Sequence, residues 1–195
     1  MSAQAHTPNP DDLAATIKTV AKKGPPPVHL WNPPFCGDLD IRIARNGLWY
    51  YLGTPIGRMP LVKLFASVLK KEDGKYFLVT PVEKIGITVD DAPFVAVDFD
   101  AAGAGEDQVL TFETNVEDEA VAGPGHPIRV ERDPETGEPS PYILIRRNLE
   151  ALIDRKSYYR LVDIGAVEEV EGTPMFGLWS SGEFFPFIPA AELEL

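Results

Sequence analysis

Residues 40–52 read DIRIARNGLWYYL, and this stretch decides the predicted fold. Ile41 and Ile43 alternate with polar residues, which is the period of a half-buried strand. The dipeptide Asn46-Gly47 favours a two-residue hairpin turn, because both residues tolerate positive φ. Leu48–Leu52 then forms the returning strand. The stretch therefore predicts a β-hairpin.

A helix follows this hairpin in the pattern. Pro60 opens it where a missing N–H has no cost, and one apolar stripe continues to Lys71. The turn at Asp73-Gly74 leads into strands expected at residues 75–82, 85–89 and 94–99. Together with the hairpin, these elements predict a first α+β lobe over residues 36–100.

Residues 101–195 repeat that order and form the second predicted lobe. Ile128–Arg132 alternates as a strand, Tyr142–Arg146 is a second strand, and Asn148 caps a helix that extends to Leu161 or Val162. Short strands are expected at the end of the chain, at residues 167–170, 175–179 and 183–187. The match of Ile41-Arg42-Ile43 to Ile128-Arg129-Val130 indicates duplication. The predicted class is α+β, with two related lobes that each contain a β-hairpin, a helix and further strands.

Residues 1–35 precede the first lobe. Asp11–Lys23 has the apolar spacing of a short amphipathic helix that Gly24 ends. Five prolines between Pro25 and Pro34 then predict an extended, stiff segment around Trp31. We interpret this segment as a strap over a lobe, with Trp31 as its anchor.

Composition places the chain among ordinary globular proteins of the cytoplasm. Of its 195 residues, 44% are hydrophobic and 25% are charged. No apolar run approaches the roughly 20 residues that span a bilayer, and Met1–Asp12 lacks the features of a secretory signal. The single cysteine, Cys36, excludes an intramolecular disulfide. We therefore expect a cytoplasmic protein without a membrane partner.

The net charge of −12 is concentrated in the second lobe. Residues 36–100 carry nine acidic and eight basic side chains, whereas residues 101–195 carry 19 and seven. A protein that grips a nucleic-acid backbone gathers basic residues on one face. Extended nucleic acid is therefore not an expected partner, whereas a single nucleotide needs only one or two arginines and stays open.

Several segments of the chain resemble a known bacterial family. They are CGDLDIRI at 36–43, GLWYY at 47–51, TPIGR at 54–58, LVKLF at 61–65, YFLVTPVEK at 76–84 and PFVAVDF at 93–99. These segments are similar to the family catalogued as domain of unknown function 1285, over a range from about Pro27 to the C-terminus. The resemblance implies two related lobes, the second superficially like a pleckstrin-homology fold. It also implies no established activity, a signalling role, and a ligand site between the lobes.

Arginines near predicted strand and helix ends are the main candidate ligand residues. Arg42 lies on the first strand, Arg58 precedes a helix N-terminus, and Arg129 occupies the matching position of the repeat. A guanidinium group near free backbone N–H groups suits a phosphate or carboxylate. With Trp49, Cys36 and Asp38 they form the predicted ligand-binding set, for an anionic, nucleotide-like ligand. The alternatives are exposed ion pairs for the arginines and core packing for Trp49.

Asp38 and Asp40 give the second hypothesis, a metal-dependent hydrolase. Two carboxylates two residues apart on a strand share one face, where they can hold Mg²⁺ or divide acid and base roles. The alternative is a solvated pair. Cys36 is either a reactive thiol, which needs a lowered pKa, or a small residue at a lobe edge.

Catalytic motifs are missing from the sequence. The histidines have no metal-ligand spacing, and neither glycine-rich phosphate loop occurs. We therefore favour a non-catalytic ligand-sensing or protein-interaction module over an enzyme, and predict no cofactor. A third hypothesis is a scaffolding subunit whose acidic second lobe meets a basic protein partner.

Overall fold

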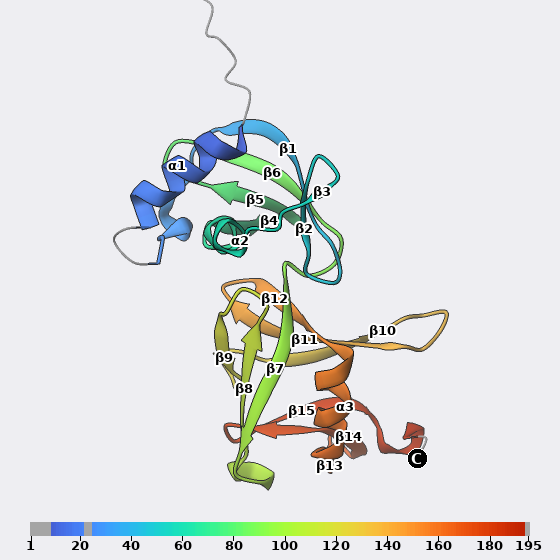
Figure 1. The fold of residues 1–195 in the computed structure, drawn as a ribbon. Helices are drawn as coiled ribbons and strands as arrows, with labels where there is room; N and C mark the ends of the chain where they lie inside the picture. Colours follow the sequence, from blue (N-terminus) through green and yellow to red (C-terminus); the bar gives the residue numbers. More distant parts are fainter. Residues whose placement is uncertain (1–8, 22–24, 194–195) are drawn as a thin grey trace, which may run out of the picture. The chain divides into compact units, whose positions relative to one another are not determined.

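The computed structural model describes residues 9–21 and 25–193, and the chain divides into two compact units after Asp91 (Figure 1). In chain order the first unit contains α1 (Pro10–Ala21), the 3₁₀ turn η1 (Val28–Leu30), β1 (Phe35–Ile43), β2 (Trp49–Tyr51), β3 (Thr54–Pro55), α2 (Met59–Ala66), β4 (Leu69–Glu72), β5 (Lys75–Val79) and β6 (Lys84–Val89). The second unit contains β7 (Phe94–Ala102), η2 (Gly105–Asp107), β8 (Val109–Thr114), β9 (Glu119–Val121), β10 (Ile128–Arg132), β11 (Pro139–Arg146), β12 (Leu149–Ile153), α3 (Arg155–Asp163), β13 (Ala166–Val170), β14 (Thr173–Ser180), β15 (Glu183–Pro189) and η3 (Ala190–Glu192).

The first unit is built on one six-stranded sheet with the order β3-β2-β1-β6-β5-β4. Strands β1–β3 and β4–β6 form two antiparallel meanders, which join where β1 pairs parallel with β6. The hairpin predicted for residues 40–52 is present, since Arg42 pairs with Tyr50 and Ile43 with Trp49. Its loop has three residues instead of the predicted two, because the Ala44 N–H donates to the Leu48 carbonyl at 2.9 Å, and of Asn46 and Gly47 only Gly47 has a positive φ. Helix α2 is inserted between the two meanders.

The second unit repeats this sheet strand for strand. Its order is β9-β8-β7-β12-β11-β10, with meanders β7–β9 and β10–β12 and a parallel pairing of β7 with β12. The prediction of an α+β protein with two related lobes is therefore confirmed. Helix α3 and the three-stranded sheet β13-β14-β15 follow the second meander.

The strands that correspond in the two units differ from those expected from the sequence. Strand β1 corresponds to β7, and β4 corresponds to β10. Arg42 on β1 and Arg129 on β10 are therefore not counterparts. Apolar–Arg–apolar tripeptides fit any half-buried strand, so this short match did not identify the repeat.

The helix expected to reach Lys71 ends at Ala66 instead. Ser67 Oγ donates to the Leu64 carbonyl at 2.6 Å, and residues 69–72 form β4. The turn Asp73-Gly74 joins two antiparallel strands and so requires a strand before it as well as after it. That requirement overrides the helical spacing of the apolar residues.

The prediction that Asn148 caps a helix is wrong. Residues 149–153 form β12, whose side chains alternate between buried and half-buried. The cap of helix α3 lies six residues after Asn148, where the Asp154 carboxylate accepts a hydrogen bond from the Ser157 N–H at 2.7 Å. Leu149, Leu152 and Ile153 have helical spacing, but the residues that alternate as the buried face of the strand are Leu149, Ala151 and Ile153.

The lobe boundary expected after Asp100 falls inside β7. The apolar run of this strand ends near Phe99, but the strand continues to pair with β8 as far as Ala102. All of β7 therefore belongs to the second unit, and the division between the units lies after Asp91. The change in hydropathy near Phe99 does not reveal this strand pairing.

The proline-rich strap lies along the edge of the first sheet. Lys70 Nζ on the edge strand β4 donates to the Trp31 carbonyl at 3.0 Å. Val28 is fully buried, whereas Trp31 is only half-buried, so Val28 is the deeper anchor. The end of the expected amphipathic helix, Lys22 and Lys23 with Gly24, lies outside the described residues.

Each unit has its own apolar core. In the first unit, the inner face of the sheet packs against apolar residues of α1 and α2, and the fully buried side chains include Leu13, Ile17, Ile41, Ile43, Phe65, Leu69, Leu78 and Ile85. In the second, they include Phe94, Leu110, Phe112, Ile143, Leu149, Leu161 and Leu178. None of the helices formed by the described residues has the length and apolar character that crossing a membrane requires.

Candidate functional site

Two adjoining cavities lie beside Arg58 in the first unit. The first, of about 690 Å³, is lined by the start of α1, the end of β2, the loop before α2, and α2 itself. The second, of about 460 Å³, follows the facing sides of α1 and α2. Asp11, Gly57, Arg58 and Leu61 line both. These volumes lie in the range of small-molecule sites.

A tight turn and a short loop build this region. Leu52 and Gly53 both have positive φ, at 48° and 75°, and they reverse the chain between β2 and β3. The Ile56 N–H donates to the Trp49 carbonyl at 2.8 Å, which holds the loop against β2. The backbone of Arg58 is extended, and this residue immediately precedes α2, so it lies at the junction of the loop and the helix.

The floor of the first cavity is aromatic and aliphatic. Tyr51, Leu61 and Phe65 line it, and Phe65 is fully buried. Trp49 lies behind Phe65, with the two rings stacked at 6.4 Å, and is only 2% exposed. Trp49 was predicted as a ligand contact, but it belongs to the core beneath the cavity and does not line it.

Arg58 differs from most arginines of this chain. Seven of the nine arginines form an ion pair with a carboxylate, and they are Arg42, Arg45, Arg129, Arg132, Arg146, Arg155 and Arg160. Within residues 9–21 and 25–193, Arg58 has no such partner. An exposed guanidinium group without a carboxylate, at the wall of two cavities, is available to an anion.

Few backbone donors accompany Arg58 at the start of α2. Pro60 has no N–H, and the N–H groups of Leu61 and Val62 both donate to the Arg58 carbonyl, at 3.0 and 3.2 Å. The predicted cradle of free N–H groups at this helix end is therefore largely absent. Any anion here depends on side chains more than on the helix N-terminus.

Two charges on α1 accompany Arg58. Asp11 lines both cavities and Lys18 lines the second. Asn9 caps this helix, since its Oδ1 accepts a hydrogen bond from the Asp11 N–H at 2.9 Å. Together with Arg58, Asp11 and Lys18 give the described lining of the two cavities a net charge of +1.

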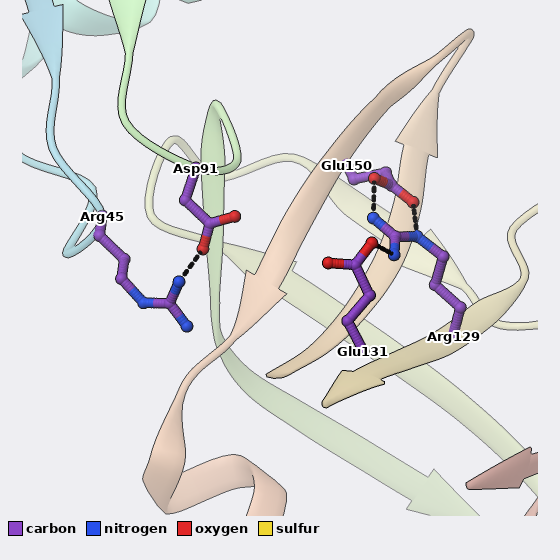
Figure 2. A network of polar contacts seen from close by, with 5 residues as sticks. All are labelled: Arg45, Asp91, Arg129, Glu131 and Glu150. Atoms are coloured by element: carbon purple, nitrogen blue, oxygen red, sulfur yellow. Dashed lines mark hydrogen bonds and ion pairs between the residues drawn. The ribbon is translucent and has the colours of Figure 1, made fainter. Parts of the chain in front are cut away.

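Arg42 is neutralised within the first unit. Its Nε donates to both carboxylate oxygens of Asp90, at 2.8 and 3.1 Å, and its guanidinium lies 5.7 Å from the centre of the Tyr50 ring. This pairing raises the pKa of Arg42 and lowers the pKa of Asp90. The nearby Arg45 pairs with Asp91 at 2.6 Å (Figure 2). These arginines stabilise the end of the first unit and do not line the described cavities.

Arg129 is held more extensively, in the second unit. Its Nε and Nη2 donate to the two carboxylate oxygens of Glu150, at 2.6 and 2.8 Å, and its Nη1 contacts Glu131 (Figure 2). The guanidinium also lies 4.4 Å from the centre of the Tyr142 ring. The hydrogen bonds that Arg129 donates to Glu150 are the largest cause of its raised pKa. Two carboxylates therefore already neutralise the guanidinium of Arg129.

Asp38 and Asp40 share the exposed face of β1, as their spacing predicts. Asp38 Oδ1 occupies the space above Gly86, only 2.0 Å from where a Cβ at residue 86 would stand. Asp38 also lines a separate shallow cavity beside β5 and β6. Among the described residues, no group of three or more His, Cys, Asp or Glu side chains could hold a metal ion. The carboxylate pair therefore lacks a third ligand.

Cys36 is half-buried on β1, and its thiol lies 3.4 Å from the Pro34 carbonyl. It does not line the cavities beside Arg58. Of the six predicted ligand residues, Arg58 alone lies at these cavities, and the structure does not bring the other five to them.

Sequence reasoning missed Asp11, Tyr51, Leu61 and Phe65 as cavity residues. Asp11 was recognised only as a charge in the first turn of a helix, and the apolar residues only as strand or stripe positions. The packing of α1 against α2 brings them together, and no local motif encodes that contact. That no described carboxylate forms an ion pair with Arg58 is likewise a property of the fold.

Comparison with known proteins gives matches over nearly the whole chain. Residues 26–92 match the family described as "Domain of unknown function (DUF1285), N-terminal domain". Residues 93–187 match "Protein of unknown function (DUF1285), C-terminal domain". The junction of these matches lies one residue after the structural division at Asp91. No curated protein matches the chain.

Two solved structures are similar to this one. The crystal structure of a DUF1285 family protein from Silicibacter pomeroyi DSS-3 is 61% identical, with a TM-score of 0.85 over 94% of this chain and 98% of that chain. A DUF1285 family protein from Shewanella baltica OS155 is 32% identical, with a TM-score of 0.50 over 64% of this chain and 91% of that chain.

Proposed function

The chain belongs to the DUF1285 family, as its sequence motifs predict, and from this premise we propose that it is a non-catalytic binding module for a small anionic ligand. The ligand occupies the cavities beside Arg58, and its binding serves a signalling role. The observation that carries the proposal is Arg58 itself. It is an exposed guanidinium without a carboxylate partner among the described residues, and it lines two adjoining cavities.

Charge composition strengthens this argument. The chain has 30 acidic residues, and seven of its nine arginines pair with one of them. Asp11, on the opposite helix, makes no ion pair with Arg58. A ligand that supplies a negative charge therefore gains a charge-assisted hydrogen bond from this guanidinium.

A binding role is favoured over catalysis by the composition of the site. Among the residues that the structure describes, no cysteine, histidine or serine lines the cavities, and Asp11 is the one lining carboxylate. General acid–base chemistry needs a titratable group within hydrogen-bond reach of its substrate, usually with a second group that orients it. The hydrolase hypothesis relied on Asp38 and Asp40, and no described third ligand supports it.

The test is a comparison of Arg58→Met with Arg42→Met. Both substitutions remove a guanidinium from the first unit and keep an unbranched side chain. Arg58→Met should lower the affinity for acetate, inorganic phosphate or ATP at least tenfold, because it removes a charged hydrogen bond of about 1.5–3 kcal/mol. Arg42→Met should leave that affinity within about twofold, because Asp90 already neutralises Arg42. Isothermal titration calorimetry measures both. Equal affinities of Arg58→Met and wild type for every anion would contradict the proposal.

A second candidate function is supported by the second unit. Residues 92–195 carry 21 acidic and seven basic side chains, a net charge of −14, whereas residues 1–91 carry nine and 11. The negative electrostatic potential of such a unit favours association with a basic protein surface. Binding of this kind weakens as salt is added and does not depend on Arg58, which distinguishes it from the first function.

A further inference from the structure

We propose that the ligand beside Arg58 is a singly charged amphiphile, an organic carboxylate with an apolar body, and not a nucleotide or another polyphosphate. This inference rests on the function proposed above and names the chemical class of the ligand. Three observations carry it: the net charge of the cavity walls, the shortage of backbone donors, and the apolar side chains of the remaining lining.

The charges of the cavity walls match one negative charge. Arg58 and Lys18 contribute two positive charges, and Asp11 contributes one negative charge. Asp11 lines both cavities, so a ligand in either of them meets its carboxylate. A nucleoside triphosphate would leave most of its negative charge uncompensated there, and like charges in a partly desolvated site repel strongly.

The start of α2 does not provide the donors that phosphate groups require. Phosphate sites at helix N-termini use several free N–H groups that point at the ligand. Here Pro60 has none, and the N–H groups of Leu61 and Val62 are taken by the Arg58 carbonyl. A planar carboxylate, in contrast, is satisfied by one guanidinium fork.

The rest of the lining combines apolar side chains with the polar Asn9, Thr54 and Tyr51. The first cavity has Pro10, Pro55, Ile56, Leu61 and Phe65 in its walls, besides Tyr51. The second adds Ala14, Ala15, Met59, Pro60 and Leu64. An apolar body that lies along these walls removes both its own surface and theirs from water.

Exposed apolar residues at the rim support the same ligand class. Met59 lines the second cavity and is 46% exposed. Leu52, which follows the lining residue Tyr51, is 64% exposed and has a φ of 48°. Leucine rarely occupies this left-handed conformation, where asparagine or glycine fits a turn better. A large apolar side chain at this position is unfavourable for the turn, and it is exposed to solvent.

The experiment titrates the full chain with acetate, hexanoate, octanoate, decanoate and ATP, all below the concentrations at which the acids form micelles. Calorimetry should give an affinity that rises from acetate to octanoate by about two- to fourfold per methylene group, because each buried methylene contributes a constant increment. Octanoate should bind more tightly than ATP. Arg58→Met should weaken octanoate at least tenfold, consistent with loss of a charged hydrogen bond.

Two further variants separate the polar and apolar parts of the site. Met59→Gln, an exposed substitution of similar length, should reduce the gain per methylene group and leave acetate unchanged. Asp11→Asn should strengthen the binding of every anion, because it removes the carboxylate that faces the ligand. Thermal unfolding of each variant verifies that the first unit is intact.

The outcomes distinguish this inference from the function on which it rests. If ATP or phosphate binds in an Arg58-dependent way and the affinity of the acids does not rise with chain length, the inference of an amphiphilic ligand is wrong. The proposed anion site beside Arg58 is then retained. If no anion depends on Arg58, both are wrong. If affinity rises with chain length but Arg58→Met has no effect, the acids bind by apolar contact alone, which also overturns both.

Discussion

The two units share one sheet topology, yet they differ in what covers the sheet and in the charge that they carry. In the first unit α2 is inserted between the meanders and packs with α1, and cavities remain beside these helices. In the second unit α3 and a three-stranded sheet follow the second meander. Their net charges are +2 and −14. The sheet is thus a common framework, and the added elements determine the surface that each unit offers.

Buried hydrogen bonds attach the cover of the second unit to its main sheet. Ser180 Oγ accepts from the Leu110 N–H at 2.9 Å and donates to the Ala122 carbonyl at 2.8 Å. Gln108 Nε2 donates to the Trp179 carbonyl at 2.7 Å. The contact of α1 with α2 in the first unit buries apolar residues such as Leu13 and Ile17 instead. Directional bonds fix one cover, whereas apolar contacts leave room beside the other.

The largest effect is expected from Gly177→Ala in β14. A Cβ at this position would stand 2.1 Å from the Phe185 carbonyl oxygen of the paired strand, and backbone cannot move aside without breaking the ladder. We expect a loss of about 3 kcal/mol or more, confined to the second unit. Differential scanning calorimetry should show the transition of that unit at a lower temperature.

Gly86→Ala in the first unit is the matched control. There the added Cβ meets the carboxylate of Asp38, which is the end of a side chain and can rotate away. The expected loss is about 1 kcal/mol. If the two variants lose equal stability, the distinction between a backbone clash and a side-chain clash does not hold.

An intermediate effect is expected from Ser180→Ala. The Ala122 carbonyl keeps a second donor, Ser181 Oγ at 2.8 Å, but the buried Leu110 N–H loses its acceptor. An unsatisfied buried donor costs about 1–3 kcal/mol, so chemical denaturation should give a loss of about 2 kcal/mol. Ser181→Ala, which leaves Ser180 in place, should lose less than about 1 kcal/mol. The reverse order would show that Ser181, and not Ser180, holds the cover.

The smallest effect concerns charge and pH. Hydrogen bonds from Lys70 and Lys84, with N–O distances of 2.7 and 2.8 Å, lower the pKa of Glu72 below its ordinary 4.5. Because the folded pKa is depressed, this stabilisation is present above pH 4.5 and is lost as the pH falls through the folded pKa. Glu72→Gln should therefore lose up to about 1 kcal/mol at neutral pH and nothing in strong acid.

The corresponding change in the second unit should have the opposite sign. Glu169 is an exposed residue of β13 in the unit whose net charge is −14. Removal of one negative charge there relieves repulsion, so Glu169→Gln should leave stability at neutral pH unchanged or slightly higher. Urea denaturation at several pH values measures both variants. A loss from Glu169→Gln equal to that from Glu72→Gln would contradict the charge contrast.

Much of the fold could be predicted because strong local signals agree with it. Asn46-Gly47 and Asp73-Gly74 mark turns, and the alternation at 128–132 matches β10 residue for residue. The errors occurred in short apolar stretches, as at 149–153, where four of five residues are apolar. Tertiary pairing resolved those cases, because a strand requires a partner that local sequence does not contain.

The candidate site was predicted only in part, for a physical reason. Arg58 was identified from its place before a helix, whereas Arg42 and Arg129 looked equally suitable. The difference lies in Asp90 and Glu150, which are distant in sequence and neutralise the other two arginines. Whether a cation is free depends on which carboxylates the fold brings to it, and spacing along the chain does not contain that information.

The parallel pairing of the first and last strands of each sheet imposes an order on folding during synthesis. Strand β1 gains its central neighbour only when β6 has been made, and β7 likewise waits for β12. Until then each meander exposes an open strand edge, which is a template for wrong pairing. A nascent chain that stalls before Lys84 would therefore expose the unpaired edge of β1 on the ribosome until translation resumes.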